Sequence, residues 1–423
     1  MISADKNKPT ASWMTGAAIL ALVLPLAACA PTAGSSGDAA GGTLVYATGD
    51  AEPDCLDPHV GGNFPQALLA SQVLESLVAL DEDGAIVPWL ATKWEASEDG
   101  LTWDFTLDEG AEFSDGTPVD AAAVKANIEH LQDPDTGSST GYLAVQQIAS
   151  VEVVSPTVAR FHLTRPDAAL LESLAQPWTA IQSPAGIERG MEENCLAPVG
   201  SGPFVVAEWV KQDHITLDRN SGYATAPGGF DAPSGESVES VTWRFIPDAT
   251  ARFAALQSGE VDVIDTPLPE QITTAESSDD LAHLDAPRPG ASNRIELNSG
   301  QAPFDDQRVR EAFIAAVDVN TGIEALFEGT APRSYSALSS VEPLAVQSPD
   351  AYVTDVERAN ALLDEAGWTE RDADGIRMRD GARLTARFPV TGAQSTQAEQ
   401  ALFEQIQAAA RDVGFDVQIT LLD

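Results

Sequence analysis

The chain has 423 residues, and its 23 lysine and arginine residues stand against 65 aspartate and glutamate residues, which gives a formal net charge of −42. Hydrophobic residues make up 43% and charged residues 21%, a composition typical of a folded chain long enough for two or three domains. The excess of acid excludes a nucleic-acid partner, because binding to phosphates requires a basic surface.

The first 28 residues have the pattern of a secretory signal. Two lysines precede an apolar stretch over 13–28, which is shorter than the roughly 20 residues of a membrane-spanning helix. The motif Leu26-Ala27-Ala28-Cys29 resembles a bacterial lipobox, which predicts cleavage after residue 28 and a lipid anchor on Cys29. The alternative is a plain signal peptide in which Cys29 has no role. Residues 29–42 are rich in Gly, Ala, Ser and Pro, as expected for a flexible tether.

Two further cysteines remain, Cys55 and Cys195. In an exported chain they form one even pair in an oxidising compartment, which predicts a disulfide between them. Two unpaired buried thiols are the alternative. Neither cysteine carries a signal for a catalytic thiol.

Strand and helix patterns alternate along the chain without an internal repeat, which predicts the α/β class with mixed sheets and more than one domain. In the first part of the chain, alternation of apolar residues predicts strands over 43–47, 102–107, 151–154, 158–163, 204–209, 215–218 and 241–246. Helices are expected to begin after the capping residues Asn63 and Asp120, and the apolar stripe of the first one continues to Val78. A further helix is expected over 248–258, ending at Gly259.

The second part of the chain follows the same alternation. Strands are predicted over 294–297 and 415–422, and helices over 306–317, 355–366 and 397–412. Breaks rich in Gly, Pro or polar residues occur at 198–203, 223–236 and 274–290, and the last of these is typical of a crossing between domains.

The sequence contains no motif for a nucleophile elbow, a phosphate-binding loop or a zinc helix. Its five histidines are scattered, so we expect surface or capping roles for them, no metal site and no cofactor. The acidic run 370–375 has the early oxygen ligands of a calcium loop, but Gly381 stands where the closing glutamate is required. Two turns around a short strand over 376–379 are therefore the favoured interpretation.

Four aromatic residues lie outside the strong periodic stripes: Phe64, Tyr142, Trp178 and Trp243. Aromatic side chains supply much of the contact area in ligand sites, so each is a candidate for lining a cleft. Packing at the periphery of the core is the alternative for each of them.

Several longer motifs occur in an order that resembles solute-binding protein family 5 of ABC importers, the oligopeptide- and dipeptide-binding proteins. The resemblance begins near Thr43 and continues to the last residue, with Ser201 where the family usually has threonine. It rests on the motifs Leu56–His59, Glu75–Leu77, Pro88–Trp94, Ser97–Trp103, Phe113–Val119, Pro198–Phe204, Asn298, Pro303–Asp306, Arg308–Arg310 and Ala359–Trp368.

This resemblance implies a two-lobed periplasmic-binding-protein-like fold (type II, cluster C) with mixed sheets, in which a hinge allows the lobes to close on a ligand. Lobe I is then expected at 43–76 and 196–285, with an inserted subdomain at 77–195, and lobe II at 286–423. Family members continue beyond the strand expected at 415–422, so we also expect lobe II to be incomplete and the chain to be truncated.

The implied function is that of a lipid-anchored receptor at the outer face of the cytoplasmic membrane, in the cell envelope or periplasmic space. We expect a monomer without enzymatic activity that binds a peptide or similar small solute and delivers it to ABC permease subunits. Relatives bind nickel chelates, sugars and opines as well. A signalling or degenerate paralogue, a non-functional truncated product and an exported hydrolase are the alternatives.

Four residues are expected to contact the ligand. Asn63 would form hydrogen bonds with it, Phe64 and Trp178 would form an apolar wall, and Arg294 would pair with a ligand carboxylate. They lie in loops whose correspondence with the family is the least regular.

Overall fold

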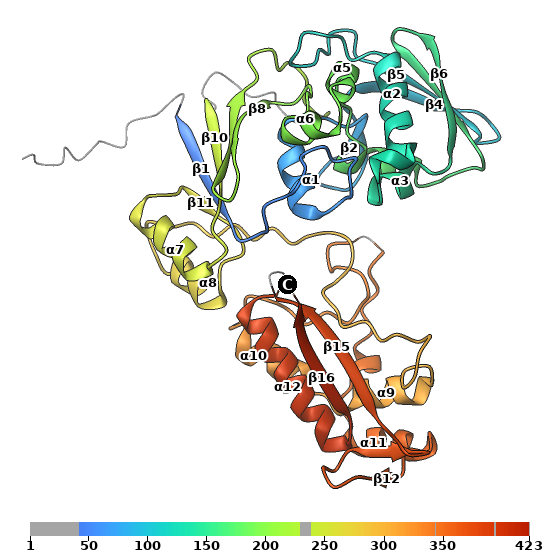
Figure 1. Ribbon diagram of the computed structural model, residues 1–423, viewed down its shortest axis with the longest axis vertical. Helices are drawn as coiled ribbons and strands as arrows, with labels where there is room; N and C mark the ends of the chain where they lie inside the picture. Colours follow the sequence, from blue (N-terminus) through green and yellow to red (C-terminus); the bar gives the residue numbers. More distant parts are fainter. Residues whose placement is uncertain (1–41, 229–237, 343, 393–394, 423) are drawn as a thin grey trace, which may run out of the picture. The chain divides into compact units, whose positions relative to one another are not determined.

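The computed structural model describes residues 42–228, 238–342, 344–392 and 395–422 (Figure 1). The predicted signal, the tether and Cys29 lie outside these residues, apart from Gly42. Within the described part of the chain, no helix is both long and apolar enough to cross a membrane.

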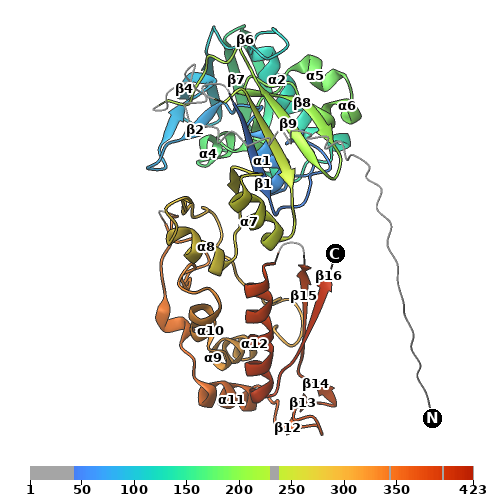
Figure 2. The same cartoon turned by 90° about the vertical axis from the view of Figure 1, so that its left-hand side faces the viewer.

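The largest sheet has five strands in the order β11-β1-β10-β9-β8. Figure 1 labels β11, β1, β10 and β8, and Figure 2 labels β9. These strands are β1 (Thr43–Thr48), β8 (Phe204–Val210), β9 (His214–Arg219), β10 (Ser240–Phe245) and β11 (Val263–Ile264). The first strand pairs in parallel with β10 and β11, while β9 is antiparallel to its neighbours. Trp243 is buried in this sheet and stacks on Tyr46, so it packs in the core.

Helix α1 (Phe64–Ala70) begins after Asn63 as predicted, but it ends eight residues before Val78. Val73, Leu74 and Leu77 are buried without being helical, so the expectation of a continuous helix is wrong. The carbonyl oxygen of Val73 accepts a hydrogen bond from the amide of Gly202 instead of from a following turn. The close approach requires glycine, since a Cβ at Gly200 would lie 2.0 Å from the Val73 oxygen.

A second sheet has the order β4-β5-β7-β6, and α2 (Ala121–Gln132) contacts it. Its strands are β4 (Ala91–Ala96), β5 (Thr102–Leu107), β6 (Ile148–Ser155) and β7 (Val158–Leu163). Phe105 and Phe161 meet in the fully buried core beneath them. The smaller elements of this part are β2 (Val78–Leu80), β3 (Ile86–Pro88), α3 (Thr140–Val145), α4 (Leu170–Leu174), η2 (Pro177–Thr179), α5 (Pro184–Glu188) and α6 (Met191–Leu196).

A disulfide joins Cys55, in the segment after β1, to Cys195 in α6. The amide of Leu56 also donates a hydrogen bond to the carbonyl oxygen of Cys195. The alternative of two free thiols therefore does not describe this structure.

The last part of the chain is mainly helical around a small parallel sheet. Its helices are α9 (Gln307–Ala316), α10 (Val319–Leu326), α11 (Val356–Glu365) and α12 (Gln397–Val413), and its main strands are β15 (Thr385–Thr391) and β16 (Asp416–Leu422). Phe304, Phe313 and Phe415 form an aromatic cluster in its core. Three short strands, β12 (Glu370–Arg371), β13 (Arg377–Arg379) and β14 (Ala382–Arg383), form a separate sheet.

The predicted strand over 294–297 does not form. Within this segment the Arg294 side chain pairs with Glu296, and just before it Ser292 donates hydrogen bonds to the carbonyl oxygens of Ser336 and Ala337. A strand forms only if a neighbouring strand pairs with its backbone hydrogen-bonding groups. The alternation of apolar residues in a sequence does not show whether such a partner is present.

Candidate functional site

Two of the predicted ligand residues stand at the start of α1. The side-chain oxygen of Asn63 accepts the amide of Gln66 at 3.0 Å, so it caps the helix. Phe64 is 39% exposed, and the guanidinium of Arg288 lies 4.0 Å from the centre of its ring. Phe64 is therefore available to a ligand, whereas the Asn63 oxygen already has a partner.

Trp178 lies on η2, which contacts α1. Its indole nitrogen is buried and has no hydrogen-bond partner within the described residues. The ring is partly buried, and Tyr142 is 44% exposed. Asn63, Phe64 and Trp178 thus belong to neighbouring elements, as a shared site requires.

Arg294 lines a cavity of about 480 Å³ within residues 292–406. Side chains of α9, α10 and α12 provide most of its apolar wall, including Phe313, Ile323 and Phe403. The Arg294 guanidinium binds Glu296 at 2.6 Å, so a ligand carboxylate would have to replace that partner.

A polar group lies at the carboxyl ends of the parallel strands of the main sheet, the edge where open α/β sheets bind ligands. The carboxylate of Asp265 accepts hydrogen bonds from the Thr48 hydroxyl at 2.6 Å, the Gly49 amide at 2.9 Å and the Tyr46 hydroxyl at 3.3 Å. Burial and the nearby Asp265 charge raise the pKa of Tyr46 well above its ordinary value.

Asp50 belongs to the same edge and has an unused acceptor. Its Oδ2 atom is buried without a hydrogen-bond partner among the described residues. Burial raises the pKa of the Asp50 carboxyl, the charge of Asp265 adds to this effect, and Arg288 opposes it. Asp50 lies among Thr48, Pro65 and Phe245 near the start of α1. The sequence interpretation did not identify Asp50, because no motif marks it.

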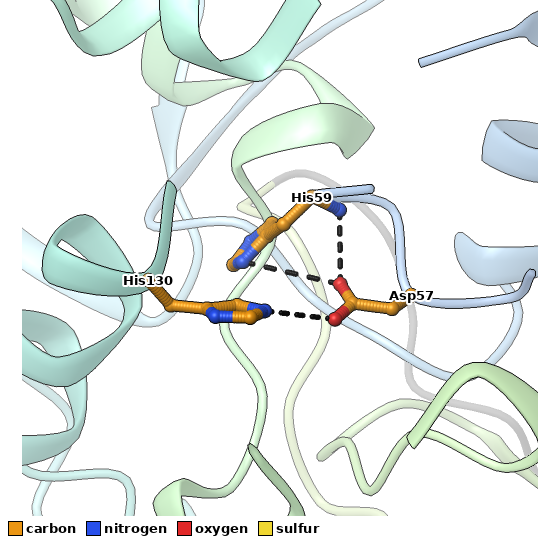
Figure 3. Close-up of side chains that lie close together, drawn as sticks. All are labelled: Asp57, His59 and His130. Carbon is orange, nitrogen blue, oxygen red and sulfur yellow. Dashed lines mark hydrogen bonds and ion pairs between the residues drawn. The ribbon is translucent and has the colours of Figure 1, made fainter. Parts of the chain in front are cut away.

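A second group of titratable side chains brings Asp57, His59 and His130 together (Figure 3). Oδ2 of Asp57 accepts a hydrogen bond from the ring nitrogen Nε2 of His130 at 2.9 Å. Nδ1 of His59 lies 4.0 Å from Oδ1 of the same carboxylate. Asp57 and His59 are completely buried. The expectation that all five histidines are isolated surface or capping residues is wrong for these two, because the fold brings His130 of α2 to the segment after β1.

Two amides complete the surroundings of Asp57. Gln182 donates to Oδ1 at 2.8 Å and Asn194 donates to Oδ2 at 2.9 Å. Burial alone would raise the pKa of Asp57, but the hydrogen bond from His130 and the charges of both histidines outweigh it and lower the pKa below its usual range. Burial lowers the pKa of His59, with Asp57 opposing this effect.

The comparisons with known proteins connect this architecture to a family. The profile of the bacterial extracellular solute-binding proteins, family 5, middle region, matches residues 85–423. The chain belongs to this family. The glutathione-binding protein GsiB of Escherichia coli strain K12 is 32% identical over 314 residues, which cover 74% of this chain and 59% of GsiB. The chain therefore spans less than two thirds of the length of the curated family 5 relatives it matches.

Solved family 5 structures agree with the predicted fold class. NikA from Brucella suis, in complex with Fe(III)-EDTA, superposes with a TM-score of 0.74 at 30% identity and covers 90% of this chain and 75% of NikA. The oligopeptide-binding protein AppA from Bacillus subtilis, in complex with a nonapeptide, gives a TM-score of 0.72 at 22% identity, with coverage of 90% and 75%. The mixed α/β architecture of periplasmic binding proteins is thus confirmed.

Proposed function

We propose that this protein is an extracytoplasmic receptor of an ABC importer that binds a peptide or peptide-like solute and delivers it to permease subunits. Membership of family 5, whose similar proteins include a glutathione-binding and a nonapeptide-bound receptor, is the observation that carries the proposal. Family 5 proteins are substrate-binding receptors rather than enzymes, and we extend this to the present chain.

We place part of the solute at the carboxyl edge of the main sheet. The unpaired Oδ2 atom of Asp50 is an acceptor suited to the ammonium group of a free peptide or of glutathione. Phe64 would cover the apolar part of the ligand, and Arg288 above its ring would add one positive charge. Trp178 would extend the apolar wall, Asn63 would hold the start of α1 in place as its cap, and Arg294 would exchange Glu296 for a ligand carboxylate.

Anchoring and assembly are part of the same proposal. Lipid attached to Cys29 would hold a monomeric receptor at the outer face of the cytoplasmic membrane, next to the permease. A receptor must favour the closed form when solute is bound. That preference arises because the solute makes more favourable contacts with the closed state than with the open state.

Isothermal titration with glutathione, a dipeptide and its N-acetylated form tests the proposal. We expect saturable binding of at least one free-amine ligand, and a loss of about tenfold or more in Asp50→Asn, because a charge-assisted hydrogen bond is removed. The N-acetylated ligand should bind the two proteins alike. Asp104→Asn is the matched control, since Asp104 forms a half-exposed pair with Arg160 in another sheet.

Failure of every ligand to bind would overturn the receptor proposal for this chain. Equal binding by the wild type and Asp50→Asn would overturn only the role of Asp50. Deletion of the gene should abolish uptake of the bound solute; unchanged uptake with altered gene expression would favour the signalling alternative instead.

A further inference from the structure

The two histidines beside Asp57 each have one ring nitrogen fixed by an oxygen acceptor. Nε2 of His59 lies 2.8 Å from the carbonyl oxygen of Ala180, which can only accept, so this nitrogen carries the proton. The other nitrogen, Nδ1, then accepts a hydrogen bond from the side-chain amide of Gln182 at 3.2 Å and lies 4.0 Å from Oδ1 of Asp57. His59 is thus held in the tautomer that can bind a cation through Nδ1, in place of the hydrogen bond from Gln182.

The protons on the ring of His130 can be assigned from its hydrogen-bond partners in the same way. The hydroxyl of Thr136 donates its one proton to the carbonyl oxygen of His130 at 2.7 Å, so at Nδ1, 3.1 Å away, it can only accept. Nδ1 of His130 therefore carries a proton. What occupies Nε2, 2.9 Å from Asp57, is then either a second proton or a cation.

Three donor atoms converge on that position: one Asp57 oxygen, Nδ1 of His59 and Nε2 of His130 lie within 4.8 Å of one another (Figure 3). Donor atoms of a tetrahedral zinc site lie roughly 3.4 Å apart, as ligand distances of about 2.0–2.1 Å require. The distance from Nε2 of His130 to Oδ2 of Asp57 is 2.9 Å and that from Nδ1 of His59 to Oδ1 is 4.0 Å, so the two distances lie on either side of that spacing.

We propose that Asp57, His59 and His130 form a binding site for a divalent transition-metal ion, with Zn²⁺ as the test ion. Two imidazoles and one carboxylate suit zinc and neighbouring metals rather than calcium or magnesium. Binding expels one proton, the one on Nε2 of His130, and forms the bonds from the metal to Nε2, Nδ1 and the carboxylate.

The groups around the three ligands support this assignment. In metal sites the second nitrogen of a ligating histidine usually donates to an oxygen, as it does here to Ala180 and Thr136. Asn194 is 1% exposed, and its side-chain oxygen has no partner among the described residues although its nitrogen binds Asp57. This oxygen is a candidate fourth ligand or acceptor for a metal-bound water. The His130 side chain, 13% exposed, provides the approach from solvent.

The site uses none of the residues that we assign to the solute. A metal held here would link the segment after β1 to α2 and α6, close to the disulfide. Its role would be to stabilise this part of the fold, independently of which solute the receptor carries.

The experiment uses the exported, purified protein, stripped with EDTA and titrated with Zn²⁺ in two buffers of different ionisation enthalpy. We expect one zinc ion per chain, release of about one proton and a higher melting temperature. His130→Gln should lower the affinity by more than about 100-fold, beyond the 10–100-fold typical of outer-sphere changes, and Thr136→Val should fall within that range. His162→Gln is the matched control, because His162 pairs with Glu152 at an exposed position.

Three results would overturn the site. The first is the absence of zinc uptake by the wild type, which would mean that a proton occupies Nε2. The second is equal uptake by wild type and His130→Gln, and the third is an equal loss in His162→Gln. If His130→Gln does not fold, the wild type loaded with Co²⁺ decides instead, because a tetrahedral nitrogen and oxygen set gives intense visible bands and an octahedral surface complex does not. If zinc instead bound as part of the solute, its affinity would fall in Asp50→Asn and stay unchanged in Thr136→Val.

Discussion

The region before residue 266 and the region after residue 290 build their interiors differently. In the first, buried polar side chains such as Asp57 and Gln182 find partners within the chain, and a disulfide ties the segment after β1 to α6. In the second, the apolar side chains of α9, α10 and α12 surround a cavity of about 480 Å³. The comparison teaches that a closed polar network can fix one region while the other retains unfilled apolar space.

The cavity has an energetic consequence. Side chains that line it, such as Phe403 and Ile406, lack packing neighbours on one side. Dispersion contacts are individually small but numerous, so a missing neighbour removes stabilisation outright. Substitutions should therefore lower the free energy of unfolding more in the first region than at the cavity wall of the second. The following experiments test this difference.

The largest effect is expected from the disulfide. Replacing Cys55 and Cys195 with serine releases a loop with a sequence separation of 140 residues, which should lower the free energy of unfolding of the first region by about 5 kcal/mol in the chain-entropy description. Urea unfolding followed by tryptophan fluorescence measures it. The transition of the second region should not move; a matching shift there would contradict the separation of the two interiors.

Asp57→Asn should follow, with a loss of about 3–5 kcal/mol, because it breaks a buried charged network in which His130 is a partner. Asp104→Asn, in a half-exposed pair with Arg160, should cost less than about 1 kcal/mol. Thermal and urea unfolding of both variants give the difference. An equal loss of unfolding free energy in the two variants would mean that the buried network around Asp57 stabilises the first region no more than an exposed ion pair does.

Truncation of the core compares the regions directly. Leu131→Ala removes a side chain that is 1% exposed in the first region and should cost about 3–4 kcal/mol. Ile406→Ala removes a residue that is 4% exposed but lines the cavity, and should cost about 2 kcal/mol. Each variant is compared with the wild type at equal urea concentration, and the reverse order would refute the interpretation of the cavity.

The smallest effect is the pH dependence that His59 produces. Its pKa is lower in the folded protein, so the unfolded chain binds more protons once the pH falls below about 6.5, and stability is lost from there downward at up to about 1.4 kcal/mol per pH unit. Asp57 has a lowered pKa, so its stabilising contribution persists until the pH falls below about 3.9. Urea midpoints of the metal-free protein between pH 7.5 and 5 should decline in the wild type and be flatter in His59→Gln. If the urea midpoint depended on pH equally in the wild type and in His59→Gln, His59 would not be the source of the pH dependence.

Much of the fold could be predicted from the sequence where neighbouring residues decide the outcome. Asn63 and Asp120 cap α1 and α2 as expected, since each side chain accepts an amide of its own first turn. Gly259 ends α7 (Ala249–Ser258) with a positive φ of 74°, a conformation that favours glycine. Strands such as β5 and β7 were visible because alternation places their apolar residues on one buried face.

The site was less predictable, because its groups depend on partners far along the chain. His130 meets Asp57 across a sequence separation of 73 residues, and the motif Leu56–His59 gave no sign of that contact. The carboxyl of Asp50 matters only because β1 ends beside β10 and β11.

The sequence alone determined the α/β class, the caps, most strands and the resemblance to family 5, because each depends on local periodicity or on a contiguous motif. The tertiary structure decided where α1 ends, since Gly202 takes the Val73 oxygen, and that Ser292, just before 294–297, binds the backbone of Ser336 and Ala337, while 294–297 itself forms no strand. It also decided the neighbours of Asp57. Each of these outcomes depends on which distant group supplies a hydrogen-bond partner, and that choice is made only when the chain is folded.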